Sequence, residues 1–300
     1  MPGSDLSAKC KNLFIALNAY LNRGLSEADK DYEKWCNIIN SGTGTEEYPI
    51  AIISGSMREW IGERIINQIS AEKMTVRNRD YEHTEQISRN DIEDDKYGFF
   101  GPVFQEMGIN AGNLWSQLAT EALCNPGNWA DGNPFFGSRK FGKATINNTM
   151  GTAALTFANY ETARKRMMGF QGADGKPLRL VPDTVMVGPD LEGTARTLFE
   201  AELVNDGQNA TVSNIHKGEC SILVNNCMVG DYAKYWFLFC TTRGYKPVVV
   251  QKRKEGALQH HDSEDCDNVI MNNVNLYGLH YRGAAFASMP HLVIGGFATA

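Results

Sequence analysis

The longest regular pattern in the chain is a stripe of apolar residues that recur every three or four positions, as in an amphipathic helix. The stripe consists of Val103, Met107, Ala111, Leu114, Trp115, Leu118 and Ala122. Pro102 suits the first position of such a helix, and the turn at Asn125-Pro126-Gly127 ends it. A helix from Pro102 to Cys124 would be about 34 Å long at 1.5 Å per residue, enough to form the spine of a domain.

The start of the chain predicts two further amphipathic helices. The first runs from about Asp5 to Asn22 and stops at Gly24. The second begins at Ser26, which can cap it. Its apolar stripe consists of Tyr32, Trp35, Cys36 and Ile39. We expect these helices to form an arm that packs on something beyond itself.

Apolar and polar residues mix from Ile69 to Ile87 in a way that predicts an extended β-hairpin. The few apolar members, among them Met74, Val76 and Tyr81, stand between charged residues, so the hairpin cannot bury a face in a core of its own. A two-stranded ribbon is marginally stable in isolation. We therefore expect it to pack on another subunit or to stay mobile.

The rest of the chain alternates helices and short strands without a regular order. Helices are predicted from about Gly151 to Gly169 and, after Pro189, from Asp190 to Ala201. The predicted strands are Thr184–Val187, Ser221–Val224, Tyr235–Cys240, Pro247–Gln251, Tyr277–Phe286 and Leu292–Phe297. This irregular order favours the α+β class.

Composition narrows the class of protein. The chain has 300 residues, of which 42% are hydrophobic and 21% charged, so it can bury a hydrophobic core without disulfide bonds or structural metal ions. Its seven cysteines lack a C-x-x-C pair, and we expect reduced thiols in a cytoplasm. We expect neither a secretion signal nor a membrane span. The net charge of −6 argues against a protein whose main work is to bind phosphates.

One motif resembles a phosphate-binding loop. Residues 137–145 contain the G-x-x-x-x-G-K core, but Ala144 stands where a Ser or Thr hydroxyl must hold magnesium, and no hydrophobic strand leads into the loop. The favoured interpretation is an exposed basic loop whose Arg139, Lys140 and Lys143 face a neighbour or nucleic acid.

Two other clusters have ordinary explanations. His260, His261, Asp262 and the acidic residues that follow are adjacent in one loop, whereas metal ligands come from fixed spacings. Glu93, Asp94 and Asp95 suit a helix start, where Asn90 can act as the cap. No nucleophile elbow occurs. We therefore expect no catalytic residue, no cofactor and no metal.

Several phrases in a fixed order resemble the major head subunit of Mu-type phages and Mu-like prophages (the gpT family). They are Trp60–Arg64, Ile87–Asp95 with Tyr97-Gly98 and Pro102, Phe104–Gly108, Asp131-Gly132 with Phe135-Phe136, Pro182–Val187 with Pro189, Leu191 and Glu192, Lys246-Pro247 with Gln251 and Arg253, and Tyr277-Gly278 with Arg282 and Ala284-Ala285. The resemblance covers nearly the whole chain and is weakest from Ala144 to Gly169 and from Glu255 to Asp267.

The resemblance implies the tailed-phage major capsid fold, also called the Hong Kong 97-type or Johnson fold. The implied parts are an N-terminal arm (1–55), an extended loop region (56–98), a peripheral domain with a spine helix (99–151), an axial domain (152–267) and a return to the peripheral domain (268–300).

The same resemblance implies a structural protein, not an enzyme, that assembles into hexamers and pentamers of an icosahedral head. The implied partners are copies of itself, packaged double-stranded DNA bound without sequence specificity, and portal, scaffold and decoration proteins, with no membrane. The implied location is the virion capsid, assembled in the cytoplasm of a bacterial host. We expect inter-subunit contacts at Trp35, Trp60, Arg64, Arg77, Arg79, Glu82, Glu85 and Arg89.

The sequence alone leaves two alternatives open. An encapsulin-like compartment shares the implied fold but houses cargo enzymes. A nucleotide-binding enzyme would use residues 137–145, with Lys143 on the phosphates.

Overall fold

A computed structural model of the chain describes residues 3–49, 73–94, 97–205, 211–263 and 266–299. The helices are α1 (Gly3–Glu27), α2 (Tyr32–Trp35), α3 (Arg89–Glu93), α4 (Phe100–Cys124), α5 (Phe157–Met168), α6 (Glu192–Phe199) and α7 (Asp267–Asn272), with short 3-10 turns η1 (Tyr97–Phe99), η2 (Pro189–Leu191), η3 (Gly230–Tyr232) and η4 (Pro290–Leu292). The strands are β1 (Cys36–Asn40), β2 (Thr45–Pro49), β3 (Lys73–Arg77), β4 (Arg79–Ser88), β5 (Ser138–Phe141), β6 (Ala144–Asn147), β7 (Thr184–Val187), β8 (Leu203–Asn205), β9 (Thr211–Ser213), β10 (Ser221–Val224), β11 (Tyr235–Phe239), β12 (Val248–Glu255), β13 (Gln259–His261), β14 (Val274–Ala287) and β15 (Val293–Phe297).

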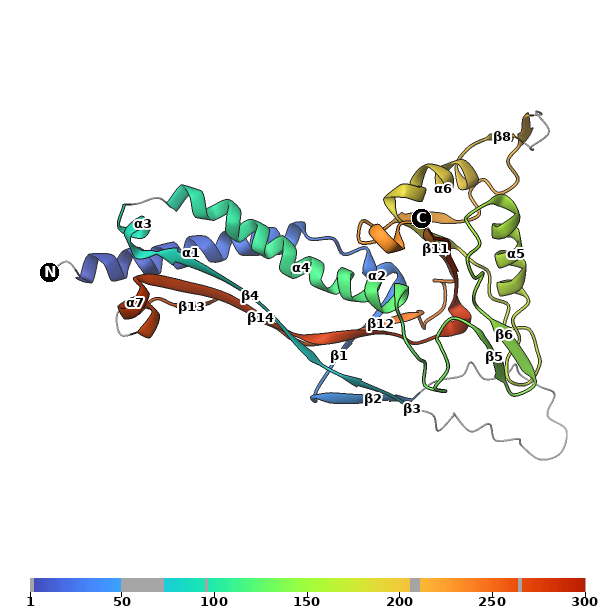
Figure 1. The fold of residues 1–300 in the computed structure, drawn as a ribbon, viewed down its shortest axis with the longest axis horizontal. Coiled ribbons are helices and arrows are strands. Elements are labelled where there is room, and N and C mark those ends of the chain that lie inside the picture. The colour runs from blue at the N-terminus through green and yellow to red at the C-terminus, as the bar shows by residue number, and fades with distance from the viewer. Residues whose placement is uncertain (1–2, 50–72, 95–96, 206–210, 264–265, 300) are drawn as a thin grey trace.

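The molecule is elongated and has two lobes (Figure 1). In the lobe that holds the N-terminus, α1 and α4 lie over a sheet that contains β4 and β14. In the other lobe, α5 and α6 flank a four-stranded sheet of order β10-β7-β11-β15. The long strand β14 leads from the first lobe toward the second, where β15 completes the sheet. The two lobes are therefore joined by continuous chain and share one core.

The five-stranded sheet is organised around β14. Strand β4 pairs antiparallel along one edge of β14, from Val274↔Ser88 to Gly283↔Arg79. Strands β12 and β13 pair with the opposite edge, and β1 continues the sheet in parallel with β12. Among the described strands, none pairs with the outer edge of β4 or of β1. Both of these strands therefore end the sheet with an open row of backbone groups.

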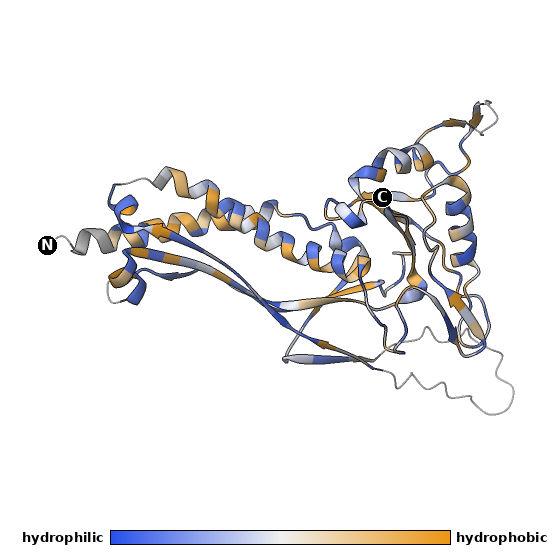
Figure 2. Cartoon of the chain, viewed as in Figure 1, coloured by the Kyte–Doolittle hydropathy of each residue, from blue (hydrophilic) through white to orange (hydrophobic). Residues whose placement is uncertain are grey.

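The spine helix predicted from Pro102 to Cys124 is confirmed as α4, whose 25 residues span about 37 Å. Its apolar side faces α1 and the sheet, while its other side is polar (Figure 2). The opening helix is also confirmed, and its apolar residues Leu13, Leu17 and Leu21 are buried, but it continues through Gly24, where we expected it to stop, to Glu27. The arm helix α1 packs along the spine helix α4 of its own chain, whereas we expected the arm to pack on a surface outside the subunit.

The backbones of α1 and α4 meet closely because glycines stand at their contact. A Cβ atom added at Gly108 would lie 2.2 Å from the carbonyl oxygen of Leu21. A Cβ atom at Gly24 would lie 1.9 Å from the carbonyl oxygen of Gln105. Neither position leaves room for a side chain, so these glycines set the distance between the two helices.

Three expectations about local structure are wrong. The second helix begins at Tyr32 and not at the predicted cap Ser26, which lies within α1, and it ends at Trp35 because the backbone from Cys36 to Asn40 pairs with β12. The helix expected from Gly151 begins only at Phe157, where Thr156 caps it by accepting a hydrogen bond from the Asn159 amide. The short acidic helix is preceded by Ser88, and not by the predicted cap Asn90.

The predicted hairpin from Ile69 to Ile87 is also wrong. Residues 73–77 pair with β2 and residues 79–88 pair with β14, so β3 and β4 follow one another along the chain and are not partners. The alternation of polar and apolar residues predicted extended structure correctly but could not identify its partners. By contrast, the strands Thr184–Val187 and Ser221–Val224 are confirmed at their predicted bounds.

Candidate functional site

A two-stranded ribbon, β2 with β3, leaves the underside of the five-stranded sheet. Its antiparallel register runs from Thr45↔Arg77 to Pro49↔Lys73, and residues 50–72 between the strands lie outside the described part of the chain. An ion pair of 2.8 Å joins Lys73 Nζ to Glu47 Oε2 across the ribbon. We call residues 45–49 with 73–77 the ribbon, and we take its attachment to the sheet as the first part of the candidate site.

A small apolar cluster holds the ribbon against the sheet face that α4 does not cover. Val76 is buried with Val249, Ala284 and Phe286, and other ribbon side chains pack against these residues. The rings of Tyr48 and Phe286 lie 5.0 Å apart. This cluster is separate from the main core, so the ribbon has its own apolar base.

A buried polar network fixes the point where the ribbon joins the sheet. Gln251 is fully buried in the middle of β12. Its amide donates a hydrogen bond of 2.6 Å to Asn78 Oδ1 and accepts one of 2.7 Å from the Tyr48 hydroxyl. The Asn78 amide donates in turn to Ser41 Oγ and to the carbonyl oxygen of Thr43. Buried polar groups that are all paired make the geometry specific.

The turn before the ribbon is closed by a carboxylate. Glu46 Oε1 accepts hydrogen bonds of 2.8 to 2.9 Å from the backbone amides of Gly42 and Thr43 and from the Ser41 hydroxyl. The amide of Thr43, followed by the hydroxyl of Ser41, lowers the pKa of the Glu46 carboxyl below its usual value. The carboxylate therefore stays ionised and holds the turn at neutral pH.

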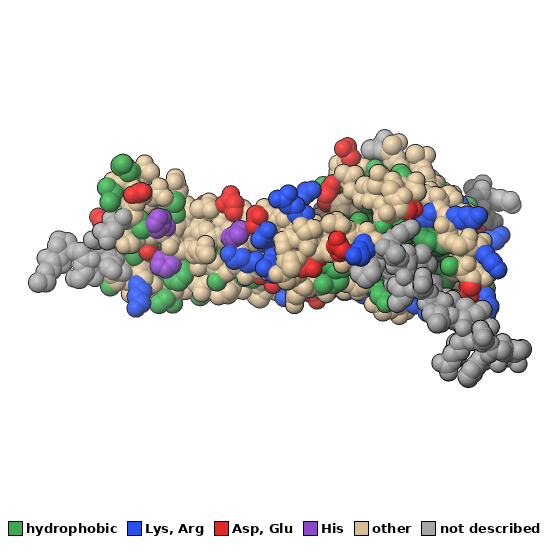
Figure 3. Space-filling view, turned by 90° about the horizontal axis from the view of Figure 1, so that it is seen from below, with side chains coloured by type: hydrophobic (Ala, Val, Ile, Leu, Met, Phe, Trp, Pro, Cys, Tyr) green, Lys and Arg blue, Asp and Glu red, His purple; other side chains and the backbone are tan. Residues whose placement is uncertain are grey.

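The outer edge of β4 forms the second part of the candidate site. This strand is polar along most of its length (Figure 2). Asp80 pairs with His280 Nε2 at 3.0 Å and with Arg282 Nε at 3.5 Å, both on β14. Lysine, arginine, histidine and acidic side chains occupy the middle of the sheet face that α4 does not cover (Figure 3). Charged side chains on an open edge discourage indiscriminate strand pairing, so a partner of this edge must match its charges.

An apolar groove of about 340 Å³ lies beside the ribbon base. Ile38 on the open strand β1 and Tyr245 on the loop between β11 and β12 are large apolar members that remain exposed, at 41% and 51%. Ribbon side chains Tyr48 and Met74 close one side of the groove. The ribbon base therefore adjoins both an open strand edge and uncovered apolar surface.

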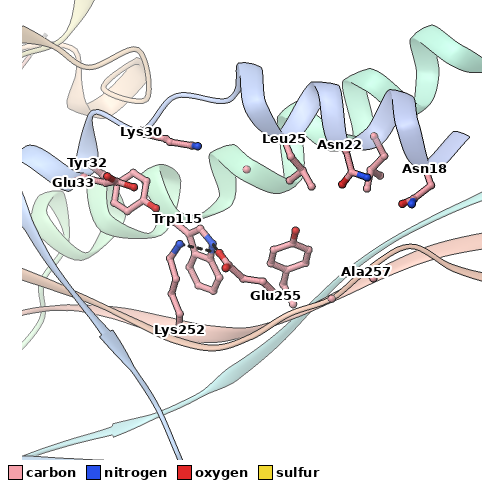
Figure 4. Close-up of a pocket in the computed structure, with 14 residues that line it drawn as sticks. Asn18, Asn22, Leu25, Lys30, Tyr32, Glu33, Trp115, Lys252, Glu255 and Ala257 are labelled. Carbon is pink, nitrogen blue, oxygen red and sulfur yellow. Dashed lines mark hydrogen bonds and ion pairs between the residues drawn. The ribbon is translucent and has the colours of Figure 1, made fainter. Parts of the chain in front are cut away.

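A second cavity, of about 530 Å³, lies between α1, α4 and the sheet (Figure 4). Glu255 Oε1 accepts hydrogen bonds from the Trp115 indole at 2.7 Å and from Lys252 Nζ at 2.8 Å. The ammonium group of Lys252 lies 5.1 Å from the Trp115 ring centre and 5.8 Å from that of Tyr32. Lys252 is thus paired with Glu255 and lies against two aromatic rings, so this cluster ties arm, spine and sheet together.

The structure brings some of the expected contact residues together and separates others. Arg77, Arg79 and Glu82 are exposed on β3 and β4, next to the ribbon base, and Glu85 on β4 is half-buried and paired with His83 at 2.9 Å. Trp60 and Arg64 lie outside the described residues.

Two of the expected contact residues serve the subunit itself. Trp35 is 1% exposed, and its ring stacks on Phe239 with 5.9 Å between centroids. Arg89 is 8% exposed in the short helix α3. Both side chains are enclosed by their own chain, so we leave them out of the contact surface.

The motif at 137–145 is a β-hairpin and not a phosphate loop. Strands β5 and β6 pair around a turn at Gly142 and Lys143, whereas a phosphate loop joins a strand to a helix. Arg139 points inward: its guanidinium pairs with Asp131 at 3.2 Å and lies 4.7 Å from the centre of the Trp129 ring. The expectation that Arg139 is exposed is therefore wrong, whereas Lys140 and Lys143 are exposed as expected.

The residues weighed as metal ligands do not converge. The His260 ring packs at a tilt against that of Phe14 of α1, with 4.1 Å between the centroids, and His260 hydrogen-bonds Asp262. Across the ranges that the structure describes, no three His, Cys, Asp or Glu side chains are placed to hold a metal ion. No helix in those ranges is both long enough and apolar enough to cross a bilayer.

Sequence reasoning missed the residues that anchor the ribbon. Ser41 and Asn78 carry no pattern that distinguishes them from ordinary turn residues. Gln251 gave one signal, because it directly follows three valines in a strand that is otherwise apolar there. A polar residue inside such a run must find a buried partner.

Comparison with known proteins gives one consistent match. The sequence profile described as "Mu-like prophage major head subunit gpT" matches residues 10–153, 147–228 and 219–296. The major capsid protein of Escherichia phage Mu is 26% identical, with 72% of this chain and 97% of that protein covered. The Mu-like prophage FluMu major head subunit of Haemophilus influenzae is 24% identical, with 95% of this chain and 73% of that protein covered.

Among solved structures, the chain is similar to one from the procapsid of bacteriophage JBD30. The TM-score is 0.58 at 21% identity, and the match covers 98% of this chain and 76% of the other. At this level of identity, the similarity shows a shared fold.

Proposed function

This chain belongs to the family of Mu-like prophage major head subunits, gpT, and we propose that it joins its neighbours in the head through the ribbon and the open edge of β4. It is a major capsid protein of a Mu-like phage head and not an enzyme. Its fold is the tailed-phage capsid fold predicted from the sequence. It associates with copies of itself into a shell and is a component of the virion.

The observation that carries the contact proposal is the attachment of the ribbon. A polar network and a separate apolar cluster hold its base at one angle to the sheet. A two-stranded ribbon is marginal unless something packs on it. In a shell, the neighbouring copy supplies that surface. The contact residues that we propose are Arg77 and Arg79 beside the base, with Glu82 and Glu85 further along β4.

The sheet pairings support domain boundaries different from those first expected. Strands β12 and β13, within residues 248–261, pair with β14 in the lobe of the spine helix, and so we place them in the peripheral domain. Strand β15 pairs with β11 in the other lobe, and so we place it in the axial domain. We propose that the extended loop is the segment from Ser41 to Asn78, whose ends meet at the ribbon base.

The proposed assembly is a set of hexamers and pentamers. The ribbon and the surface it meets are different parts of the chain, so the contact is heterologous and repeats around a ring until it closes. Many such contacts, each weak, add to a container that is stable through multivalency. The further partners that we propose are packaged double-stranded DNA and portal, scaffold and decoration proteins, and we propose assembly in the host cytoplasm.

The experiment that tests this proposal removes the ribbon without touching β4. Thr45 and Arg77 are opposite one another in the ribbon register, so an Asn-Gly turn can replace residues 46–76 and reconnect the chain. We expect a folded subunit, with β4 still paired to β14, that forms no shells by electron microscopy.

A charge test keeps the whole chain. Arg77→Glu and Glu82→Lys change exposed side chains on the proposed contact surface, whereas Lys30→Glu changes an exposed side chain near the end of the arm helix. All three variants should unfold at nearly the wild-type temperature, but only the first two should reduce the yield of shells. Normal shells from both contact variants would remove these residues from the proposal.

The alternatives are less well supported. A cargo compartment of the encapsulin type shares the fold, but the family match is to phage head subunits. A nucleotide-binding enzyme at residues 137–145 is excluded by the family and by the hairpin geometry.

A further inference from the structure

Positive charge is concentrated in one stretch of this acidic chain. Residues 128–180 contain eight basic residues, Arg139, Lys140, Lys143, Arg164, Lys165, Arg166, Lys176 and Arg179, and three acidic ones, Asp131, Glu161 and Asp174. The stretch therefore carries an excess of five positive charges, whereas the whole chain carries −6. Figure 3 shows Lys and Arg side chains at the end of the molecule where Figure 1 places α5, β5 and β6. A charge asymmetry of this kind indicates a polyanionic partner.

The β5–β6 hairpin sorts its side chains by face. Arg139 and Phe141 point inward and are buried. Ser138 and Lys140 point outward, as does Thr145 opposite Lys140 on β6. Lysine, serine and threonine side chains are among those that contact phosphate oxygens without reading sequence.

The hairpin turn is locked against a second loop that adds a further lysine. The backbone amide of Lys143 donates a hydrogen bond of 3.1 Å to the carbonyl oxygen of Ala173. Gly142 has φ +54°, and a Cβ atom there would lie 2.5 Å from the same oxygen. The loop then closes on itself through the amide of Gly172 and the carbonyl oxygen of Lys176. The two basic segments are thus held side by side. We call Lys140, Lys143 and Lys176 the basic corner.

From this arrangement we propose that the basic corner contacts the phosphate backbone of the enclosed double-stranded DNA, without sequence preference. The inference rests on the proposed function, because it needs DNA inside the shell. Within the described part of the chain, Lys140 and Lys143 have no ion pair, whereas exposed lysines elsewhere, such as Lys217 with Glu202, do. The charges of Lys140 and Lys143 are therefore available to a ligand, whereas Lys176 also interacts within the chain.

The residue types favour DNA over a neighbouring subunit. Lysine is depleted in protein interfaces, where arginine and aromatic residues are enriched. A lysine ammonium is a flexible point charge, which suits weak contact with phosphates at variable positions. A few such contacts in a chain of net charge −6 would hold DNA weakly enough to leave it free to move.

The experiment compares two triple variants of the full chain. K140Q/K143Q/K176Q removes the basic corner. K34Q/K217Q/K234Q removes the same number of charges from lysines that are paired with Asp31, Glu202 and Asp190. Binding of a fluorescein-labelled DNA duplex is measured by fluorescence anisotropy between about 50 and 200 mM salt.

We expect the slope of log affinity against log salt to fall by up to about 3 for the basic-corner variant, since each phosphate contact contributes about 0.9. The control should change it by less than about 1. Equal slopes for wild type and the basic-corner variant would overturn the inference. Shell formation is scored in parallel by electron microscopy. Loss of shells in the basic-corner variant alone would instead make the corner a contact between copies, which overturns the DNA assignment but leaves the proposed function in place.

Discussion

Replacing Gln251 by leucine tests how the ribbon is held. Leucine fills a similar volume but removes the hydrogen bonds to Asn78 Oδ1 and from the Tyr48 hydroxyl. A buried polar group that loses its partner costs about 1–3 kcal/mol. Asn78 is 3% exposed and incurs most of that cost, whereas Tyr48 is half-buried and can reach water. The expected loss in the free energy of unfolding is therefore about 1–3 kcal/mol, or roughly 5- to 150-fold in the unfolding constant.

The matched control is Tyr48→Phe, which removes one hydroxyl and keeps the ring against Phe286. It should cost about 1 kcal/mol. Urea unfolding of both single variants and of the double variant gives a double-mutant cycle. Because Gln251 and Tyr48 share one hydrogen bond, the double variant should lose less than the sum of the two single losses.

Two results would contradict this reasoning. A loss below about 1 kcal/mol for Gln251→Leu would mean that the network does not hold the ribbon base. Additive losses in the cycle would mean that the two side chains do not interact in solution. If the reasoning is right, Gln251→Leu should also lower the yield of shells, because the ribbon loses its fixed angle.

Two further predictions concern the core. Gly108→Ala should destabilise the chain although alanine favours helices, because the added Cβ would meet the Leu21 carbonyl oxygen. Gly193→Ala in α6, where a Cβ would have no atom within 4 Å, should instead stabilise the chain by about 0.5–1 kcal/mol in thermal unfolding. Equal effects at both glycines would contradict the tight contact of α1 and α4. Burial, then the charge of Arg243, lowers the pKa of His291 from 6.5 to about 4. The unfolded chain therefore gains a proton between pH 6.5 and 4 that the folded chain does not, and the free energy of unfolding should fall by about 3 kcal/mol as the pH drops through that window. Urea unfolding at pH 7 and pH 4 should show a smaller fall for His291→Gln, and an unchanged fall would rule out this histidine as its source.

The sequence predicted elements that are set by local pattern. The spine helix was predictable because its apolar stripe persists over about five turns and because Pro102 and Asn125-Pro126-Gly127 mark its ends. The strand Thr184–Val187 was predictable because its apolar run stands between Asp183 and Gly188.

Elements that depend on distant partners were not predictable in the same way. Cys36 and Ile39 fit a helical stripe, yet the segment is a strand because β12 offers it backbone partners. The polar alternation from residue 79 to 88 was read correctly as extended, but its partner β14 lies near the other end of the chain. The sequence predicts an exposed basic loop around Arg139, and only the fold places Trp129 and Asp131 against this side chain.

The family resemblance supplied the function, whereas the contact residues came from it only in part. Arg77 and Glu82 do lie on an exposed surface beside the ribbon. Trp35 does not, because large aromatic residues fill cores as readily as interfaces. The polar anchor at Gln251 and Asn78 could be found only from the coordinates, since its members are distant in sequence.

The most direct test of the account is cryo-electron microscopy of particles formed by the expressed full chain. We expect closed shells in which the ribbon of each subunit, together with Arg77 and Glu82, contacts a neighbouring copy. A discrete monomer, or a shell in which the ribbon and the outer edge of β4 face only solvent, would contradict it.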